Sequence, residues 1–371
     1  MPIHPIKRLE DNVRDLVQIG DYVLYLLINF FKFKPIPRDI RRILVVELLN
    51  IGDIIVITPT LRALRQHYPF AEIDVLLKKD KQEVLANHPS ITNVIPYISF
   101  FQTLSTLRQR KYDLALLLHP GSLKISTLLL KAGIKYRVGG TKTGITYGKG
   151  FFLHKKAFPN NKWQHKIDDN LDIIRFINIH PTTRRLELSL NPQVEKNIKT
   201  LLSKKKKPLI GMNVASQHPS QRWHPERFAQ VANELIKKYK ATIVFTGIEK
   251  ERDQIQAVIN HIPNKQSILD LTGKTNFEEL KAVIKHLDVL ITIDSSSTHI
   301  ASAFDTPVLT LFGSTIPTFW GPTGKHSSYI WKNKEANVGW RREYLIVGKD
   351  DSMEKISTQE VLEQAKKLLK N

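Results

Sequence analysis

The segment RRILVVELLNIGDIIVITPTLRALRQHYP, residues 41–69, is the most informative about architecture, because a strand-like run passes through a polar turn into a helix-like run. Apolar and β-branched residues dominate up to Leu49, which is typical of a buried strand. From about Asp53 to His67 the apolar residues recur with helical spacing. Since a strand followed directly by a helix is the building unit of a parallel sheet, the segment predicts the first βα unit of an α/β domain.

The same alternation continues along the chain. Further strand-like runs IDVLL, NVIPY, LALLLH and YRVGG alternate with helices expected near 101–111 and 122–132. The pattern restarts beyond the lysine-rich run SKKKKP with LIGMNV, TIVFTG, ILDLTG, VLITID and VLTLFG, between helices expected at 225–239, 250–261 and 276–286. We therefore expect two doubly wound, Rossmann-like domains with a cleft between them and ligands beyond the carboxyl ends of the strands.

The length of 371 residues exceeds what one hydrophobic core usually serves, which also favours two domains. The expected parts are an N-terminal extension at 1–40, a first domain at 41–190, a linker at 191–207, a second domain at 208–350 and a final helix at 351–371. The final helix either completes the second domain or crosses back to the first. The apolar run YVLYLLINFF at 22–31 is too short to cross a bilayer. The extension around it is expected to form an amphipathic helix that packs on the first domain or lies on a membrane surface.

Composition narrows the class of protein. The chain lacks cysteine, which excludes disulfides, thiol nucleophiles and cysteine-based zinc sites and favours a cytoplasmic location. A net charge of +21 and a pI of about 9.8 predict an anionic partner, which is a phosphorylated substrate, an acidic membrane face or a nucleic acid. No recognisable nucleic-acid-reading motif accompanies the charge, so a nucleic-acid partner is not expected.

Candidate functional residues lie first in the turn NIGD. Asp53 falls in the first turn of the expected helix, where a carboxylate either caps the helix or faces a ligand beyond the strand end. Asn50 belongs to the same loop, and Gly52 permits a strained turn or the close approach of a ligand. Pro59 is expected to kink the helix or shift its start.

The segment LITIDSSSTHIASAF, residues 290–304, has the same geometry with a richer set of polar groups. Its candidate ligand residues are Asp294, Ser295, Ser296, Ser297 and His299. Serine hydroxyls and backbone N–H groups at a helix start converge on an anion, for which a diphosphate is the natural ligand. The Asp294 carboxylate would repel phosphate and is assigned to turn geometry or to a sugar hydroxyl. The histidine either contacts the ligand or is a buried core residue.

Two further strand ends carry polar residues. In SQHPSQRWHPERFA, Ser216 and Arg222 are candidate donor-binding residues, whereas Trp223 is expected to anchor the core. Glu249 follows the strand TIVF, where a carboxylate accepts two ribose hydroxyls or simply starts a helix. The chain contains no Gly-x-Gly-x-x-Gly fingerprint after a strand, no Walker A motif and no Asp-x-Asp pair. Backbone amides and cationic side chains are therefore expected to meet the phosphate charge without a metal ion.

Three motifs together resemble glycosyltransferase family 9, which includes the bacterial lipopolysaccharide heptosyltransferases. They are NIGDIIVITPTLRALRQHYP, SQRWHPERFAQVANEL and DSSSTHIASAFDTPVLTLFGSTIPTFWGP, and they span roughly residues 41–330 in the order of the family. The resemblance implies a GT-B fold, with the acceptor mainly on the first domain and the nucleotide-sugar mainly on the second. It also implies inverting transfer without a metal ion.

The resemblance assigns roles to individual residues. It implies that Asp53 is the general base, that Asp294, Ser295 and Ser296 lie near the donor sugar and diphosphate, and that Glu249 binds the ribose. Two positions depart from the family, because Gln221 replaces a frequent lysine and Ser296 replaces the usual glycine. Arg222 or another cation would then offset the charge of the leaving group.

The expected function is transfer of a heptose or related sugar from a nucleotide-diphosphate donor, such as ADP-heptose, to a hydroxyl of a lipopolysaccharide-like or other cell-surface glycan. The expected partners are the nucleotide-sugar and an anionic glycan or glycolipid, with peripheral contact at the inner face of the cell membrane. No separate cofactor is expected. The alternative is a non-catalytic nucleotide-sugar or glycan-binding protein of the same fold, and an isomerase of the related epimerase type is a further one.

Overall fold

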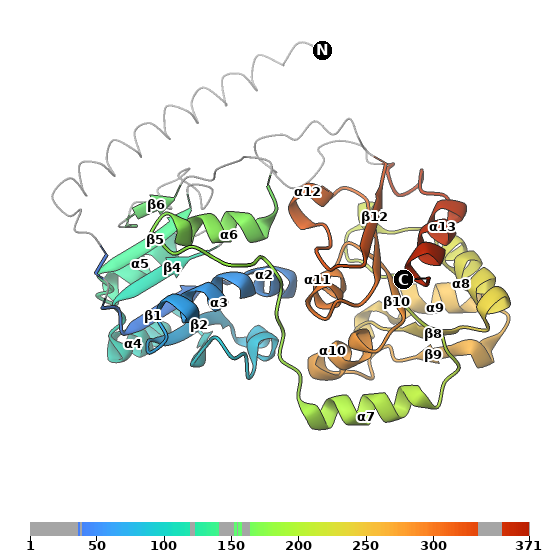
Figure 1. The fold of residues 1–371 in the computed structure, drawn as a ribbon, viewed down its shortest axis with the longest axis horizontal. Helices are drawn as coiled ribbons and strands as arrows, with labels where there is room; N and C mark the ends of the chain where they lie inside the picture. The colour runs from blue at the N-terminus through green and yellow to red at the C-terminus, as the bar shows by residue number, and fades with distance from the viewer. Residues whose placement is uncertain are drawn as a thin grey trace, which may run out of the picture. The chain divides into compact units, whose positions relative to one another are not determined.

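The computed structural model describes residues 36–37, 39–118, 123–140, 152–153, 155–157, 164–332 and 351–370. They belong to two compact units that divide between Arg184 and Arg185, before the boundary expected at residue 190 (Figure 1). Each unit contains a six-stranded sheet in which all neighbouring strands are parallel. Almost all of the N-terminal extension lies outside the described residues, as does most of the glycine-rich stretch at 139–150.

The first unit has the strand order β3-β2-β1-β4-β5-β6. Its strands are β1 (Arg42–Val46), β2 (Glu72–Lys78), β3 (Asn93–Tyr97), β4 (Leu114–Leu117), β5 (Tyr136–Gly140) and β6 (Lys155–Ala157). The central strands read as uninterrupted apolar runs because helices cover both faces of the sheet. All strands point the same way, so every strand end carries its following loop at one edge.

The helices of the first unit are α2 (Ile51–Val56), α3 (Thr58–His67), η1 (Lys79–Leu85), α4 (Phe100–Arg110), α5 (Leu123–Lys131) and α6 (Lys166–Arg175). One helix was expected from Asp53 to His67, and the structure has two. Pro59 falls in the first turn of α3, where its missing N–H costs nothing, whereas in a continuous helix it would break the hydrogen-bond ladder. Helices α4 and α5 pack on each other and on one face of the sheet, and α3 packs on α6.

The second unit has the strand order β12-β11-β10-β7-β8-β9. Its strands are β7 (Leu209–Asn213), β8 (Thr242–Phe245), β9 (Ile268–Asp270), β10 (Val289–Ile293), β11 (Val308–Phe312) and β12 (Ser327–Trp331). Strands β10, β7 and β8 are consecutive neighbours. The loops that follow these three strands therefore lie at one edge of the sheet.

The helices of the second unit are α7 (Pro192–Ser203), α8 (Pro225–Tyr239), α9 (Arg252–Asn260), α10 (Phe277–Lys285), α11 (Ser296–Ala303), α12 (Pro317–Trp320) and α13 (Thr358–Leu368). The turns η4 (Pro219–Gln221), η5 (Glu249–Glu251) and η6 (Lys265–Ser267) are 3₁₀ helices. Trp223 is a core residue, as predicted, since its ring packs edge-on against Phe228 with centroids 4.8 Å apart.

The stretch 191–207, expected to be a linker, contains helix α7. Asn191 caps this helix by accepting a hydrogen bond from the Gln193 N–H at 2.9 Å, and Ile198 and Leu202 bury its apolar face. The helix packs against α10 and so belongs to the second unit. Helix α13 packs against α8 and against strands β10 to β12, which shows that it completes the second unit.

The expected fold class of two doubly wound α/β domains is confirmed. In the part of the chain that the structure describes, no helix has both the length and the apolar character needed to cross a bilayer.

Candidate active site

Asp53 lies in the first turn of α2, directly beyond the carboxyl end of β1. Its side chain is 7% exposed, and its Oδ2 atom accepts a hydrogen bond from the Asn50 N–H at 3.0 Å. The carboxylate thus fastens the helix start, as the capping interpretation predicts, and at the same time lies at the sheet edge where ligands bind. Gly52 is helical in the same turn, so no strained conformation explains its presence.

The environment of Asp53 makes its carboxylate unusually basic. Burial raises its pKa from 3.8 to about 6, because desolvation disfavours the charged form. The hydrogen bond from Asn50 and the positive charges of Lys166 and Lys78 lower the pKa, but they do not cancel the effect of burial. A carboxylate with this pKa is ionised at neutral pH and accepts a proton more readily than an ordinary aspartate.

Glu47, which the sequence interpretation did not select, lies beside this group. Its side chain is 1% exposed, and its Oε1 atom accepts a hydrogen bond from the Leu49 N–H at 2.9 Å. The Oε2 atom is buried and has no hydrogen-bond partner among the residues described. Burial, and then the negative charge of Asp53, raise the pKa of Glu47 well above its usual range. The pair therefore favours a protonated Glu47 next to an ionised Asp53. The only sequence signal was a charged residue placed directly after a buried strand.

Lys166 is the second residue that sequence reasoning missed. It lies in the first turn of α6, is almost fully buried, and forms an ion pair with Asp169 at 2.8 Å. Its charge lowers the pKa of Asp53 although the two residues are far apart in the sequence. No motif surrounds it, so only the folded chain reveals its place.

In the second unit, the serines open helix α11 at the end of β10. Ser295 is the N-cap, and its Oγ atom accepts a hydrogen bond from the Ser297 N–H at 3.3 Å and lies 3.1 Å from the Thr292 hydroxyl. Asp294 and Ser296 are half-buried at the same place. Because the N–H groups of a first helical turn lack partners within the helix, this end of α11 is suited to an anion.

Two of the expected ligand residues are packed inside the unit. Ser297 and His299 are almost fully buried, and the His299 ring lies edge-on to Trp320 with centroids 6.3 Å apart. In contrast, the buried Thr315 hydroxyl, in the loop after β11, has no hydrogen-bond partner among the described residues. Strand β11 neighbours β10, so this hydroxyl belongs to the same edge as the serines.

The loop after β7 is held by a network centred on Ser216. Its hydroxyl donates to the Gln221 side-chain oxygen at 2.9 Å and accepts from the His218 N–H at 3.0 Å. The exposed Arg222 donates from Nε to the Ser216 carbonyl at 2.7 Å. A lysine at position 221 has no acceptor atom, so the Ser216 hydroxyl would lose this partner. Glutamine at position 221 is therefore explained by the hydrogen bond through which it holds the loop after β7.

Glu249 follows β8 and is fixed by Arg252. Both carboxylate oxygens accept hydrogen bonds from the Arg252 guanidinium, each at 2.6 Å. This guanidinium lowers the pKa of Glu249, and it is itself held by the Thr272 carbonyl at 2.8 Å. Gly273 has a φ of +68° and lies so close that a Cβ atom there would be 2.1 Å from Glu249 Oε2. The carboxylate is thus exposed, ionised and oriented, with lone pairs left for hydroxyl groups.

The loops after β7 and β11 pack tightly on each other at Gly313. A Cβ atom on Gly313 would lie 2.2 Å from the Ser220 carbonyl oxygen, and the hydroxyls of Ser220 and Ser314 are 2.9 Å apart. Because the opposing atom belongs to the backbone, it cannot move aside easily.

We expect Gly313→Ala to lower the free energy of unfolding of the second unit by about 1–3 kcal/mol, the usual cost of overpacking. Urea unfolding followed by circular dichroism measures this change. Gly140→Ala is the control, since among the described residues a Cβ atom there would meet only Ile173, at an ordinary contact distance of 3.5 Å. Equal stability of the two variants would show that the loops are not held against each other.

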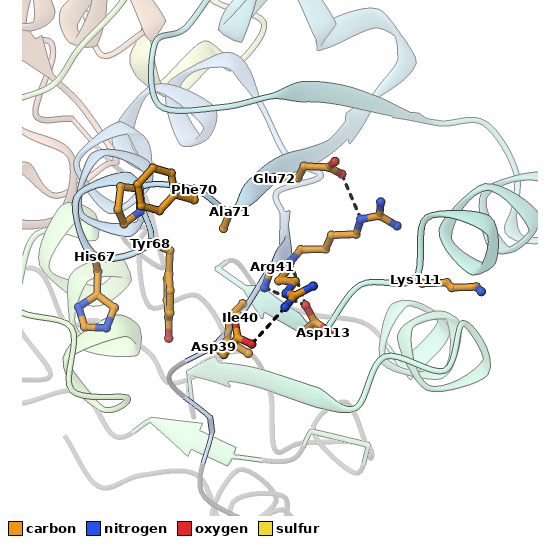
Figure 2. Close-up of a pocket in the computed structure, with 12 residues that line it drawn as sticks. Asp39, Ile40, Arg41, His67, Tyr68, Phe70, Ala71, Glu72, Lys111 and Asp113 are labelled. Atoms are coloured by element: carbon orange, nitrogen blue, oxygen red, sulfur yellow. Dashed lines mark hydrogen bonds and ion pairs between the residues drawn. The ribbon is translucent and has the colours of Figure 1, made fainter.

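A cavity of about 750 Å³ lies at the opposite edge of the first sheet (Figure 2). Arg41, Arg42 and Glu72 line it near the amino ends of β1 and β2, and Asp113 lines it just before β4. The Asp113 carboxylate is occupied by the N–H groups of Arg41 and Arg42 at 3.0 and 2.9 Å. Ligands of such sheets bind beyond the carboxyl ends, so this cavity is not the candidate active site. Within the described ranges, no cluster of three or more His, Cys, Asp or Glu side chains could hold a metal ion.

The chain is similar in sequence to known heptosyltransferases. The family model described as glycosyltransferase family 9 (heptosyltransferase) matches residues 100–344. The chain is 26% identical over 300 residues to lipopolysaccharide heptosyltransferase 3 of Escherichia coli, covering 76% of this chain and 86% of that protein. It is 24% identical over 348 residues to lipopolysaccharide heptosyltransferase 2 of Salmonella typhimurium, covering 88% and 98%.

Solved structures share the fold. A glycosyl transferase family 9 structure from Veillonella parvula superposes with a TM-score of 0.77 at 24% identity and covers 91% of this chain and 99% of its own. The E. coli heptosyltransferase WaaC with ADP superposes with a TM-score of 0.67 at 15% identity, covering 88% and 99%.

Proposed function

Because the chain belongs to glycosyltransferase family 9, we propose that it transfers a heptose or related sugar from ADP-heptose or a similar donor to a hydroxyl of a lipopolysaccharide-type glycan. The chain is a glycosyltransferase. We propose which sugar it transfers, which acceptor receives that sugar and which residues act in the reaction. ADP-heptose is the proposed donor because one similar structure is the E. coli ADP-heptose lps heptosyltransferase II and another is WaaC with ADP-2-deoxy-2-fluoro heptose. The observation that carries the mechanism is the buried Asp53 carboxylate, whose pKa is raised to about 6 at the end of β1.

In the proposed reaction, the acceptor hydroxyl donates a hydrogen bond to Asp53. As its oxygen attacks the anomeric carbon, Asp53 takes the proton and the bond to the diphosphate breaks, with the electron pair leaving on the phosphate oxygen. Attack from the face opposite the leaving group inverts the configuration. A positioned base of this kind typically contributes about 10²–10⁴-fold to the rate.

The donor is assigned to the edge formed by β10, β7 and β8. The first turn of α11, with Ser295 and Ser296, would receive the diphosphate, and Arg222 would offset its charge. Glu249 would accept the ribose hydroxyls. Neutralisation by amides and a guanidinium would stabilise the departing diphosphate without a metal ion. Transfer requires that the acceptor held by the first unit reach this donor.

The pH dependence follows from the pKa of Asp53. A base must be ionised, so kcat/KM should be flat above pH 7 and should fall about tenfold per pH unit below a midpoint near 6. Initial rates at subsaturating substrate, measured across this range with a folding check at each pH, give the profile. A midpoint near 4 would mean that the essential base is an ordinary exposed carboxylate.

A direct assay tests the function. Purified full-length protein is incubated with ADP-heptose and a lipopolysaccharide core acceptor, with and without EDTA, and the products are followed by mass spectrometry and NMR. The proposal expects a glycosylated acceptor of inverted anomeric configuration, at the same rate in EDTA. Donor binding without turnover would favour the non-catalytic alternative, and a rearranged donor without transfer would favour an isomerase.

The place of action is part of the same proposal. The net charge of +21 suits an anionic glycolipid acceptor at the inner face of the cell membrane. The amphipathic stretch at 22–34 that was expected to help hold the protein there lies outside the described residues.

A further inference from the structure

Large apolar side chains are exposed at the edge of the first unit that carries Asp53. Ile98 is 55% exposed and Phe101 is 80% exposed, and both follow the carboxyl end of β3. Leu123, which follows β4 at the start of α5, is 44% exposed. Since β3, β2, β1 and β4 are consecutive parallel strands, these side chains and Asp53 belong to one edge of one sheet. Monomeric proteins rarely leave several large apolar side chains exposed together without use.

Lysines adjoin these apolar side chains. Lys78 ends β2 directly opposite Tyr97 in the strand register, and the Lys124 ammonium group lies 5.8 Å from the centre of the Tyr97 ring. Lys79 follows Lys78, and all three lysines are exposed. In the part of the chain described, no salt bridge engages the ammonium group of any of the three. Lys78 also acts on the Asp53 carboxylate electrostatically, which connects the lysines to the candidate base.

We propose that the apolar–basic edge, formed by Lys78, Lys79, Ile98, Phe101, Leu123 and Lys124, binds the face of a lipid bilayer that contains anionic headgroups. Phe101, Ile98 and Leu123 enter the interfacial region, and the lysines contact the headgroup phosphates. The inference goes beyond the proposed function, because it assigns a membrane contact to the folded first unit. It rests on that function only in that the membrane would carry the acceptor.

A bilayer fits this surface better than a second copy of the chain. A symmetric dimer through the edge would bring the lysines of two chains together, and like charges in contact cost several kcal/mol. Three apolar side chains are also far fewer than the roughly 20–30 residues a side of a stable protein interface. A membrane needs no matching shape and supplies both the apolar layer and the negative charge. Because the apolar–basic edge and Asp53 belong to the same edge of the sheet, a lipid-anchored acceptor in that membrane would lie near the base.

The test measures sedimentation of the full-length chain with vesicles of phosphatidylcholine alone or with roughly 30 mol% phosphatidylglycerol. Phe101→Ser should lower the partition coefficient onto the anionic vesicles at least about fivefold. Phe70→Ser is the matched control, since Phe70 is 97% exposed and lines the cavity at the opposite edge of the same sheet. It should bind like the parent chain.

A second pair of variants tests the charge. Lys124→Gln should weaken binding to the anionic vesicles about fivefold, whereas Lys237→Gln, on an exposed position of α8, should have little effect although it changes the net charge equally. Equal binding of Phe101→Ser and Phe70→Ser would overturn the proposal. It would also be overturned if Phe101→Ser abolished a self-association seen by light scattering without vesicles.

The proposed function and the proposed membrane surface can be refuted independently. Vesicle binding is measured without donor or acceptor, so a chain that transferred no sugar would still test the surface. Conversely, the chain could transfer sugar normally to a water-soluble acceptor fragment while all four variants bound vesicles equally. That result would refute the membrane proposal and leave the proposed function intact.

Discussion

Replacing Asp53 by asparagine should lower the transfer rate at saturating substrates by at least about a hundredfold, the lower end of general-base effects. The amide retains the size of the side chain and an oxygen that can accept the Asn50 N–H, but it cannot take a proton from the acceptor hydroxyl. Donor affinity, measured by isothermal titration calorimetry, should stay within about twofold, because the donor is assigned to the other unit. Near-normal turnover would remove Asp53 from the mechanism.

The same substitution should not weaken the fold. The pKa of Asp53 is raised in the folded chain, so ionisation of this carboxyl opposes folding, and the penalty appears as pH rises from 3.8 through about 6. At about pH 8 the full penalty is present, and the difference between the two pKa values corresponds to at most about 3 kcal/mol. Asp53→Asn should therefore match or exceed the parent chain in free energy of unfolding at that pH, and the difference should vanish in acid. An inactive variant that is also less stable at pH 8 would assign Asp53 a capping role instead.

Introducing a carboxylate at Ser296 should weaken donor binding without lowering the stability of the second unit. Ser296 is the first residue of α11, where a negative charge favours the helix by about 0.3–1 kcal/mol. The same charge would stand where the donor diphosphate is expected, and like charges in contact cost several kcal/mol. Ser296→Asp should therefore keep or raise the melting temperature while weakening nucleotide-sugar binding by at least about a hundredfold.

Thr358→Asp is the matched control for this experiment. Thr358 is also the first residue of a serine-capped helix in the same unit, α13, whose N-cap Ser357 accepts the Glu360 N–H at 3.3 Å. The added charge should stabilise α13 similarly and leave donor affinity unchanged. If both variants bound the donor like the parent chain, the diphosphate would have to lie elsewhere.

The layered fold was predictable because its signals are local. Parallel strands covered on both faces leave uninterrupted apolar runs, and β10 and β11 were found from such runs. Helix α8 was predicted with both ends, and Pro225 gave the signal for its first turn. In the structure the helix ends where Lys240 adopts the left-handed conformation, with φ 56°. The edge strands β6 and β12 were not predicted, because β6 has three residues and β12 mixes polar with apolar ones.

The candidate site was predictable only in part. Asp53 and the serines of α11 stand out because a polar residue after a buried strand has a defined place in an α/β sheet. The high pKa of Asp53 could not be predicted, since it depends on how deeply the folded chain buries the carboxylate. Lys166 and the bond between Ser216 and Gln221 likewise depend on contacts made only after folding. The assignment of catalytic and donor-binding roles stays a prediction.

Amide hydrogen exchange with and without the bound nucleotide-sugar tests whether the two units divide the reaction between them. We expect the donor alone to slow exchange most strongly in peptides covering 294–299 and 246–251, where the first turn of α11 and the loop of Glu249 lie. The peptide covering 47–56 should change only when the acceptor is added. Strongest protection of 47–56 by the donor alone, or no protection at the start of α11, would show that the donor does not bind the second unit as proposed.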